Sequence, residues 1–174
     1  MNSLRKLRRE VFSWAAIVLQ LLQSGYRRVT ARRVEELQDY TEIEPRLFLG
    51  GRCKHPPPDV RAVLCVTPSR DDFSVEFYQW RPAPTGAVPT MAWVREQVEF
   101  IDEHMKADHG VFVHCDAGMD RSATVVVAYL MWRDGLGRDR AIEVLQRKRA
   151  IRPNPAFMQM LAVWEGSMRD SKPS

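Results

Sequence analysis

Residues 114–122 combine a cysteine, a glycine, an arginine and a serine at spacings that suit attack on a phosphate ester. The thiolate is the nucleophilic form of cysteine, and Cys115 at the head of a loop leading into a helix would have its thiolate stabilised by N–H groups and the helix dipole. Arg121, six positions later, can hold two phosphate oxygens with its planar guanidinium. Gly118 permits a tight turn and close approach to an anion. Ser122 can donate a hydrogen bond to Cys115.

Each of these residues also has a purely structural interpretation. Cys115 could be a small buried side chain at a strand end, which is the commoner fate of a free cysteine. Arg121 could be a surface charge at a helix start, and Ser122 a plain N-cap. We favour the phosphate site because it explains all of these residues together.

The elements around this segment must present it at a sheet edge. Residues 111–114 predict a short buried strand and residues 122–132 an apolar helix, so the loop between them lies where α/β sheets bind ligands. Further periodicity predicts strands at 46–49, 60–66 and 75–80, and helices at 90–108, 139–149 and 156–168. The expected fold class is therefore α/β, with a central, mostly parallel sheet flanked by helices.

The 174 residues, 45% of them hydrophobic, fit one globular domain. Cysteines occur at 53, 65 and 115 only, so neither a disulfide framework nor a paired metal motif is expected, and a reducing, cytoplasmic compartment is predicted. Cys65 lies in an apolar run and is expected in the core, whereas Cys53 is ambiguous. The spacing of His55, His104 and His109 suggests no metal, and these three are expected at the surface.

The basic charge is concentrated in an N-terminal arm, residues 1–39. Residues 1–33 hold eight of the 26 basic and one of the 22 acidic residues, giving +7, and the rest of the chain carries −3. This distribution argues against nucleic-acid binding by the domain. An apolar stripe between arginine clusters predicts an amphipathic helix. Residues 4–33 could lie on an anionic membrane, or the helix could pack on the domain or a second subunit; a signal peptide ranks below these.

The segment 114–122 resembles the signature loop of the cysteine-based protein tyrosine phosphatases, most closely that of the dual-specificity branch. Residues 43–50 resemble the opening strand of that family, and residues 152–157 its closing segment, so the likeness covers about 40–168, with 169–174 as a tail. It implies that Cys115 attacks phosphorus to form a phosphocysteine, and that His114 tunes Cys115 through backbone contacts. No metal or cofactor is implied. The implied phosphate-binding residues are Asp116, Ala117, Gly118, Met119, Asp120 and Arg121.

One family feature, the general acid, is missing. The dual-specificity acid position falls at or next to Pro84, and no Asp or Glu occurs between Glu76 and Glu96. Asp71 and Asp72 are expected to be solvated turn residues. Inositol lipid phosphatases of the myotubularin and Sac types carry an Asp directly before the signature Arg, so Asp120 is a candidate replacement acid; alternatively, it points to solvent or pairs with an arginine.

Asp116 and Asp120 also place negative charge beside a site built for a dianion, which would repel phosphate. The predicted function is a cysteine-dependent phosphatase acting first on protein phosphotyrosine, with phosphoserine and phosphothreonine as secondary substrates. The alternatives are a phospholipid or phosphoinositide phosphatase at a membrane surface, and a catalytically weak module that binds phosphorylated residues. Residues 1–33 also resemble the N-terminal region of mitochondrial-type phosphatidylglycerophosphate phosphatases. A sulfurtransferase of the rhodanese type is disfavoured by Arg121-Ser122 and by the Pro-Asn-Pro segment.

Overall fold

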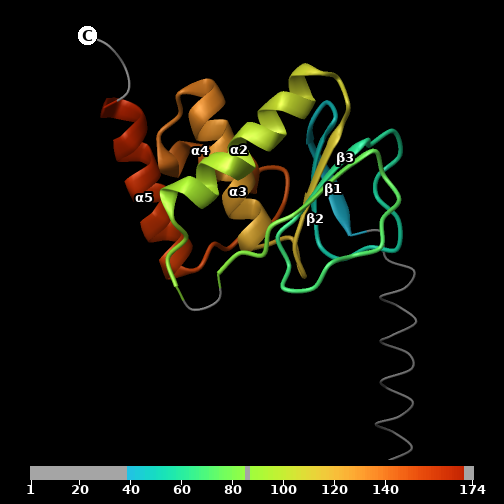
Figure 1. Ribbon diagram of the computed structural model, residues 1–174. Coiled ribbons are helices and arrows are strands. Elements are labelled where there is room, and N and C mark those ends of the chain that lie inside the picture. Colours follow the sequence, from blue (N-terminus) through green and yellow to red (C-terminus); the bar gives the residue numbers. More distant parts are fainter. Residues whose placement is uncertain (1–38, 85–86, 171–174) are drawn as a thin grey trace, which may run out of the picture. The chain divides into compact units, whose positions relative to one another are not determined.

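A computed structural model describes residues 39–84 and 87–170 (Figure 1). The chain divides into two units, residues 1–37 and 38–174, and the described residues all belong to the second. The predicted arm lies outside the described residues except for Asp39, as does the end of the predicted tail. Among the described helices, none is both long and apolar enough to cross a bilayer.

A five-stranded sheet forms the centre of this unit, in the order β1-β2-β5-β3-β4. The pair β1–β2 is antiparallel, and every other neighbouring pair is parallel. The predicted central, mostly parallel sheet is therefore confirmed. The strands are β1 (Tyr40–Glu44), β2 (Leu47–Gly50), β3 (Ala62–Cys65), β4 (Phe77–Trp80) and β5 (Val111–His114).

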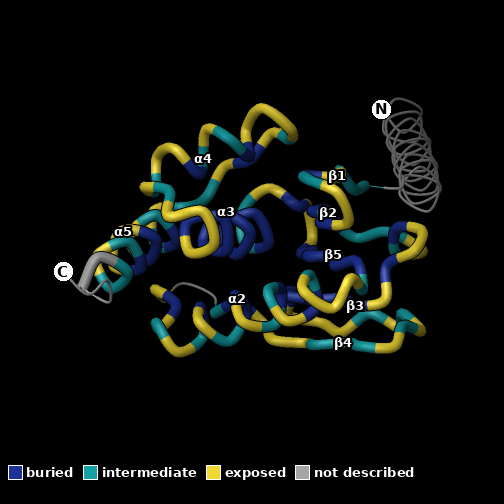
Figure 2. Tube along the Cα trace, turned by 90° about the horizontal axis from the view of Figure 1, so that it is seen from above, coloured by how far each residue is buried: buried dark blue, intermediate teal, exposed yellow. Residues whose placement is uncertain are grey.

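The described helices all lie on one side of the sheet, and loops lie on the other (Figure 2). The helices are α2 (Met91–Lys106), α3 (Arg121–Asp134), α4 (Arg138–Gln146) and α5 (Pro155–Asp170). Helices α2 and α3 contact the strands, and α4 and α5 pack against α3. The helix ends follow the sequence signals. Thr90 caps α2 by accepting a hydrogen bond from the Trp93 N–H at 3.2 Å, and Gly135 ends α3 in the left-handed conformation, with φ 65°.

The most buried elements, β5 and α3, directly flank the predicted loop. All four residues of β5 are buried, with β2 and β3 on either side. Helix α3 is buried without a break from Ser122 to Met131, because α2, α4 and α5 pack around it. The loop between β5 and α3 is thus held at both ends by the core.

Two expectations need correction. The predicted opening strand over 43–50 is a hairpin, because Pro45 and Arg46 make a turn and Arg46 adopts a positive φ of 71°. His104 is not at the surface: it is 5% exposed, and its Nδ1 lies 3.0 Å from Nδ1 of His109. The ring of Phe77 contacts both histidines. His104 and His109 thus form a cluster with Phe77, and their spacing in the sequence did not predict this contact.

Candidate active site

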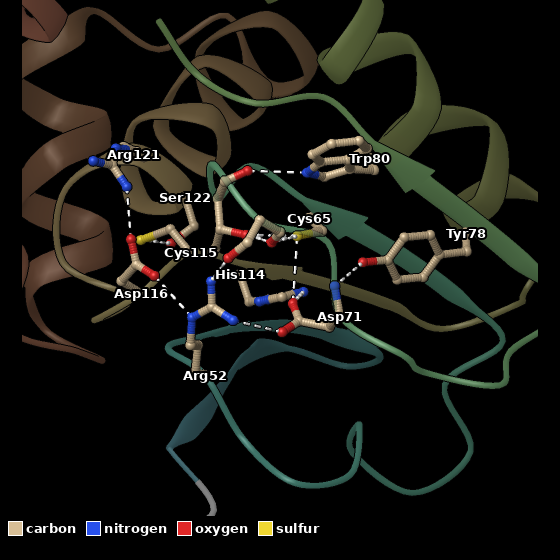
Figure 3. Close-up of polar contacts among 12 residues, drawn as sticks. Arg52, Cys65, Asp71, Tyr78, Trp80, His114, Cys115, Asp116, Arg121 and Ser122 are labelled. Carbon is tan, nitrogen blue, oxygen red and sulfur yellow. Dashed lines mark hydrogen bonds and ion pairs between the residues drawn. The ribbon is translucent and has the colours of Figure 1, made fainter. Parts of the chain in front are cut away.

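The loop from His114 to Ser122 leaves β5 at the carboxyl edge of the sheet and runs into the start of α3 (Figure 3). Cys115 is 3% exposed, and its N–H donates to the Gly50 carbonyl at the end of β2, at 3.2 Å. The nucleophile candidate therefore sits where two parallel strands and a helix N-terminus converge, as expected for a ligand site in an α/β fold.

The carbonyl groups of the loop are turned outward, each toward a donor elsewhere in the chain. In a trans peptide the next N–H points opposite to the carbonyl, and the described residues contain no cis peptide. The N–H groups of residues 117–120 consequently point away from these donors, an orientation that suits an anion cradle on the other side of the loop. The bonds are Arg52 N–H to Asp116 O (3.1 Å), Arg149 Nη2 to Ala117 O (3.1 Å), Arg149 Nε to Gly118 O (3.0 Å) and Arg152 N–H to Met119 O (2.7 Å).

Gly118 is required where the loop turns. Its φ is +65°, in the left-handed region, and a Cβ there would collide with the backbone of Gly50 and the guanidinium of Arg149. The structure agrees with the predicted tight turn. The close approach at Gly118 is made by the backbone of β2.

Ser122 contacts the sulfur of Cys115 directly. Its hydroxyl donates to Sγ at 3.1 Å, and the serine is fully buried. A hydrogen bond to a charged acceptor stabilises that charged form. The contact that the sequence suggested between these two residues is therefore present, and it suits a thiolate that must form and later be regenerated.

Arg121 and Asp116 are joined within the loop. Arg121 Nη1 donates to Asp116 Oδ2 at 2.8 Å, and Arg52 Nε donates to Asp116 Oδ1, also at 2.8 Å. Partial burial opposes ionisation of Asp116, but the hydrogen bonds from both arginines outweigh it and hold the pKa of Asp116 below its ordinary value. Asp116 is thus a carboxylate that occupies a nitrogen of Arg121 which could otherwise bind phosphate.

Arg52 is a site residue that the sequence reasoning missed. It links the loop to a second polar cluster, because its Nη1 donates to Asp71 Oδ1 at 2.9 Å. The available signal was its place directly after Gly50-Gly51, at the end of the strand beside β5.

Asp71 is not the solvated turn residue that was expected. Its side chain is 13% exposed, and its Oδ2 lies 3.4 Å from both His114 Nε2 and Cys65 Sγ. Cys65 is fully buried, as predicted, and so is His114. Burial lowers the pKa of His114 to about 4, so its ring is neutral at pH 7. The three side chains lie together beneath the loop (Figure 3).

The side chain of Asp120 is hydrogen-bonded to Asn154, and to no arginine in the described part of the chain. Its Oδ1 accepts from the Asn154 N–H at 2.8 Å, and its Oδ2 accepts from Asn154 Nδ2 at 3.0 Å. These bonds tie the signature loop to the segment before α5. Because both oxygens accept N–H donors from Asn154, the geometry suits an anchor of the loop.

The expected general-acid position near Pro84 and the remaining cysteine, Cys53, lie outside the signature loop, and the hydrogen bonds beside them are made to other segments. Ala83, beside Pro84, is buried, and its N–H donates to the Val66 carbonyl at 3.2 Å; residues 85 and 86 lie outside the description. Cys53 is half-buried, and its thiol donates to the His55 carbonyl at 3.0 Å. A cavity of about 350 Å³ between α2, α3 and α5 is lined by Trp132 and Trp164 and by no residue of the loop.

Comparison with known proteins places these features in a family. The model of the dual specificity phosphatase catalytic domain matches residues 67–167. Dual specificity protein phosphatase 1B of Arabidopsis thaliana is 31% identical over 144 residues, covering 76% of this chain and 85% of that protein. Human dual specificity protein phosphatase 1 is 34% identical over 137 residues, covering 73% of this chain but 37% of that protein.

A solved structure, that of PTPMT1 in complex with PI(5)P, shares the fold. It has a TM-score of 0.67 and 23% identity, and the match covers 75% of this chain and 97% of that one. At this identity, the likeness concerns the arrangement of strands and helices.

Proposed function

Because the chain belongs to the dual specificity phosphatase family, we propose that it hydrolyses aryl phosphate monoesters, protein phosphotyrosine first among them, through Cys115. The observation that carries this proposal is the Cys115 sulfur with the Ser122 hydroxyl 3.1 Å away, at the head of a loop whose carbonyl groups are bound by donors elsewhere in the chain. Such a site stabilises both a thiolate and a phosphate dianion.

The reaction proceeds in two displacements. The Cys115 thiolate attacks phosphorus, an S–P bond forms, and the bond to the leaving oxygen breaks. Water then attacks phosphorus, the S–P bond breaks, and phosphate leaves as the thiolate is restored to its bond with Ser122. Arg121 binds non-bridging oxygens in both steps, which requires its Nη1 to exchange Asp116 for phosphate.

The nature of the leaving group decides how well the site works. Asp116 is held ionised by two arginines, Asp120 accepts two N–H donors from Asn154, and the sequence offers no carboxyl between Glu76 and Glu96. A phenolate leaves tolerably without a proton, whereas an alkoxide does not. Loss of general-acid help costs roughly 10²–10⁴ in rate, so phosphoserine, phosphothreonine and other alkyl esters are the poorer substrates.

The test is turnover of p-nitrophenyl phosphate, phosphotyrosyl peptide and phosphoseryl peptide by the full chain. Cys115→Ser should abolish turnover of all three, and Cys53→Ser, a half-buried cysteine outside the loop, should leave it intact. Turnover that persists in Cys115→Ser, or that is fastest on the alkyl ester, would contradict the proposal. If wild type does not exceed Cys115→Ser while phosphopeptide still binds, the chain is a phosphoresidue-binding module instead.

A phospholipid or phosphoinositide is the second candidate substrate. The observation that favours it is the charge of +7 on residues 1–33, which would attract an anionic membrane. The solved PTPMT1 structure also holds PI(5)P. Turnover of phosphoinositide in anionic vesicles should then fall when Arg5, Arg8 and Arg9 are changed to Gln, while turnover of p-nitrophenyl phosphate stays unchanged. Equal turnover in anionic and zwitterionic vesicles would reject a membrane role.

A further inference from the structure

Cys65, Asp71 and His114 form a compact cluster of potential metal ligands beneath the phosphate-binding loop. Sγ of Cys65, a carboxylate oxygen of Asp71 and a ring nitrogen of His114 all lie within 4.8 Å of one another. Neither strand order nor sequence spacing makes this cluster obvious, because the three residues come from the end of β3, the loop after it and the end of β5.

The environment of His114 indicates that this cluster binds a ligand. Its side chain is 0% exposed, yet neither ring nitrogen has a hydrogen-bond partner of proper geometry. Phe112 stacks on one side of the ring, with the centroids 5.0 Å apart. A buried polar group without a partner destabilises the folded state, because its desolvation is not compensated. The Nε2 atom lies 3.4 Å from Asp71 Oδ2, so it faces the other two donors.

We propose that Cys65, Asp71 and His114 bind a zinc ion. With ordinary Zn–S, Zn–N and Zn–O bond lengths, a tetrahedral ion separates a carboxylate oxygen from a thiolate by about 3.5 Å and from an imidazole nitrogen by about 3.3 Å. Both observed separations from Asp71 Oδ2 are 3.4 Å. The ligands already have nearly the required spacing around this oxygen.

The donor types fit zinc better than a hard cation. A thiolate, an imidazole and one carboxylate suit Zn²⁺, whereas Mg²⁺ and Ca²⁺ prefer oxygen throughout. The two negative ligands balance the ion, so the occupied cluster is neutral. Thr67 Oγ1 lies 3.1 Å from Cys65 Sγ and donates to the Ser69 carbonyl, so a water molecule would complete the tetrahedral set.

Outer contacts hold Asp71 in place for this role. Arg52 Nη1 donates to Oδ1 at 2.9 Å and leaves Oδ2 toward the cluster. The Asp71 N–H donates to the Tyr78 hydroxyl at 3.1 Å. Such outer partners orient metal ligands and tune their affinity. The side chain of Asp71 is 13% exposed and that of His114 is 0% exposed, so of these two ligands Asp71 is the one that reaches solvent.

Zinc bound here would fasten the loop after β3 to β5, one residue before the nucleophile. Binding to the folded state alone also raises thermal stability. The site is independent of the phosphatase proposal, because Cys115 is not among its ligands.

The experiment is a Co²⁺ titration of the metal-stripped full chain, followed by the absorbance of the thiolate–Co²⁺ bond, with zinc stoichiometry and melting temperature measured in parallel. Cys65→Ser and Asp71→Asn remove ligands. Cys53→Ser and Cys115→Ser are the matched cysteine controls, and Cys115→Ser also removes the other thiol near the loop.

We expect one metal ion per chain and the thiolate band in wild type and in both controls. The band should vanish in Cys65→Ser, and Asp71→Asn should bind Co²⁺ at least about tenfold more weakly, since even outer-partner loss costs 10–100-fold. Zinc should raise the melting temperature of wild type but not of Asp71→Asn. If Cys65→Ser does not fold, Asp71→Asn decides.

Three results would overturn the proposal: no band in wild type, a band that survives in Cys65→Ser, or a band lost in Cys115→Ser. The last result would place the metal on the nucleophile. Whether Cys115 hydrolyses phosphate esters is decided separately, by the turnover of wild type and Cys115→Ser with chelator present.

Discussion

Arg121 Nη1 donates to Oδ2 of Asp116, five residues before it in the same loop, at 2.8 Å. The arginine that must bind phosphate is thus paired with a carboxylate of its own cradle. Arg52 holds the other oxygen of Asp116 at 2.8 Å, so the carboxylate is fixed between two guanidinium groups. Substrate must displace it from one of them.

Replacement of Asp116 by Asn should therefore tighten phosphate binding. The ion pair is partly exposed, and such pairs contribute about 0.2–1 kcal/mol, so the inhibition constant of inorganic phosphate should fall roughly 1.4- to 5-fold. Product inhibition of p-nitrophenyl phosphate turnover measures it. Asp139→Asn, which removes an exposed carboxylate on α4, is the charge-matched control. Weaker inhibition in Asp116→Asn would mean that Asp116 instead holds Arg121 in its binding geometry.

Ser122→Ala should slow regeneration of the thiolate. The hydroxyl donates to Sγ at 3.1 Å, and a hydrogen bond to a charged acceptor is worth about 1.5–3 kcal/mol, which corresponds to roughly 10- to 100-fold in the breakdown of phosphocysteine. Rapid mixing with p-nitrophenyl phosphate should show a burst of one nitrophenolate per chain before a slow steady state. Ser167→Ala, a hydroxyl bound to the Trp164 carbonyl on α5, should show no burst. A uniformly slow reaction without a burst in Ser122→Ala would argue that Ser122 acts on the first step.

Asp120 and Asn154 should behave as one structural unit. Their two hydrogen bonds predict that Asp120→Ala and Asn154→Ala each lower the free energy of unfolding by about 1–3 kcal/mol, and that the double variant loses less than the sum. Urea unfolding of the four proteins gives the coupling energy. As an anchor, Asp120 should affect aryl and alkyl substrates alike. A loss confined to alkyl phosphates in Asp120→Asn would identify it as the acid.

Local patterns in the sequence were enough to predict the loop and its supports. The nucleophile, the turn glycine, the arginine and the serine lie within residues 114–122, and the flanking strand and helix have clear periodicity, so the interactions among them are short-range in the chain. The absence of a carboxyl group near Pro84 was also predictable, because it depends only on which residues occupy that segment of the sequence.

Contacts between distant segments were not predictable. Arg52 reaches Asp116 across 64 residues, and Asp120 reaches Asn154 across 34. Asp71 looks like a solvated turn residue until the loop carrying it folds over the sheet edge beside His114. No periodicity encodes such encounters, since they depend on how loops cross the sheet. The predicted N-terminal helix stays a prediction.

Two buried histidines should make the fold sensitive to mild acid. Burial lowers the pKa of both His104 and His114, the latter to about 4, whereas an unfolded histidine titrates near about 6.5. In addition, the Nδ1 atoms of His104 and His109 are 3.0 Å apart, so one of them must lack a proton to accept the other's. Below about pH 6.5 these histidines therefore bind protons in the unfolded chain while they stay neutral in the folded chain.

The stabilising contribution of these neutral rings is present above about pH 6.5 and is lost as the pH falls below it. Each proton taken up on unfolding contributes a slope of at most about 1.4 kcal/mol per pH unit, and His104→Asn should remove one such contribution. Urea unfolding between about pH 8 and about pH 5, with chelator present to keep His114 metal-free, measures the slope. His55→Asn, an exposed histidine, should leave the slope as in wild type. An equally steep decline in His104→Asn would show that the proton uptake on unfolding lies elsewhere in the chain.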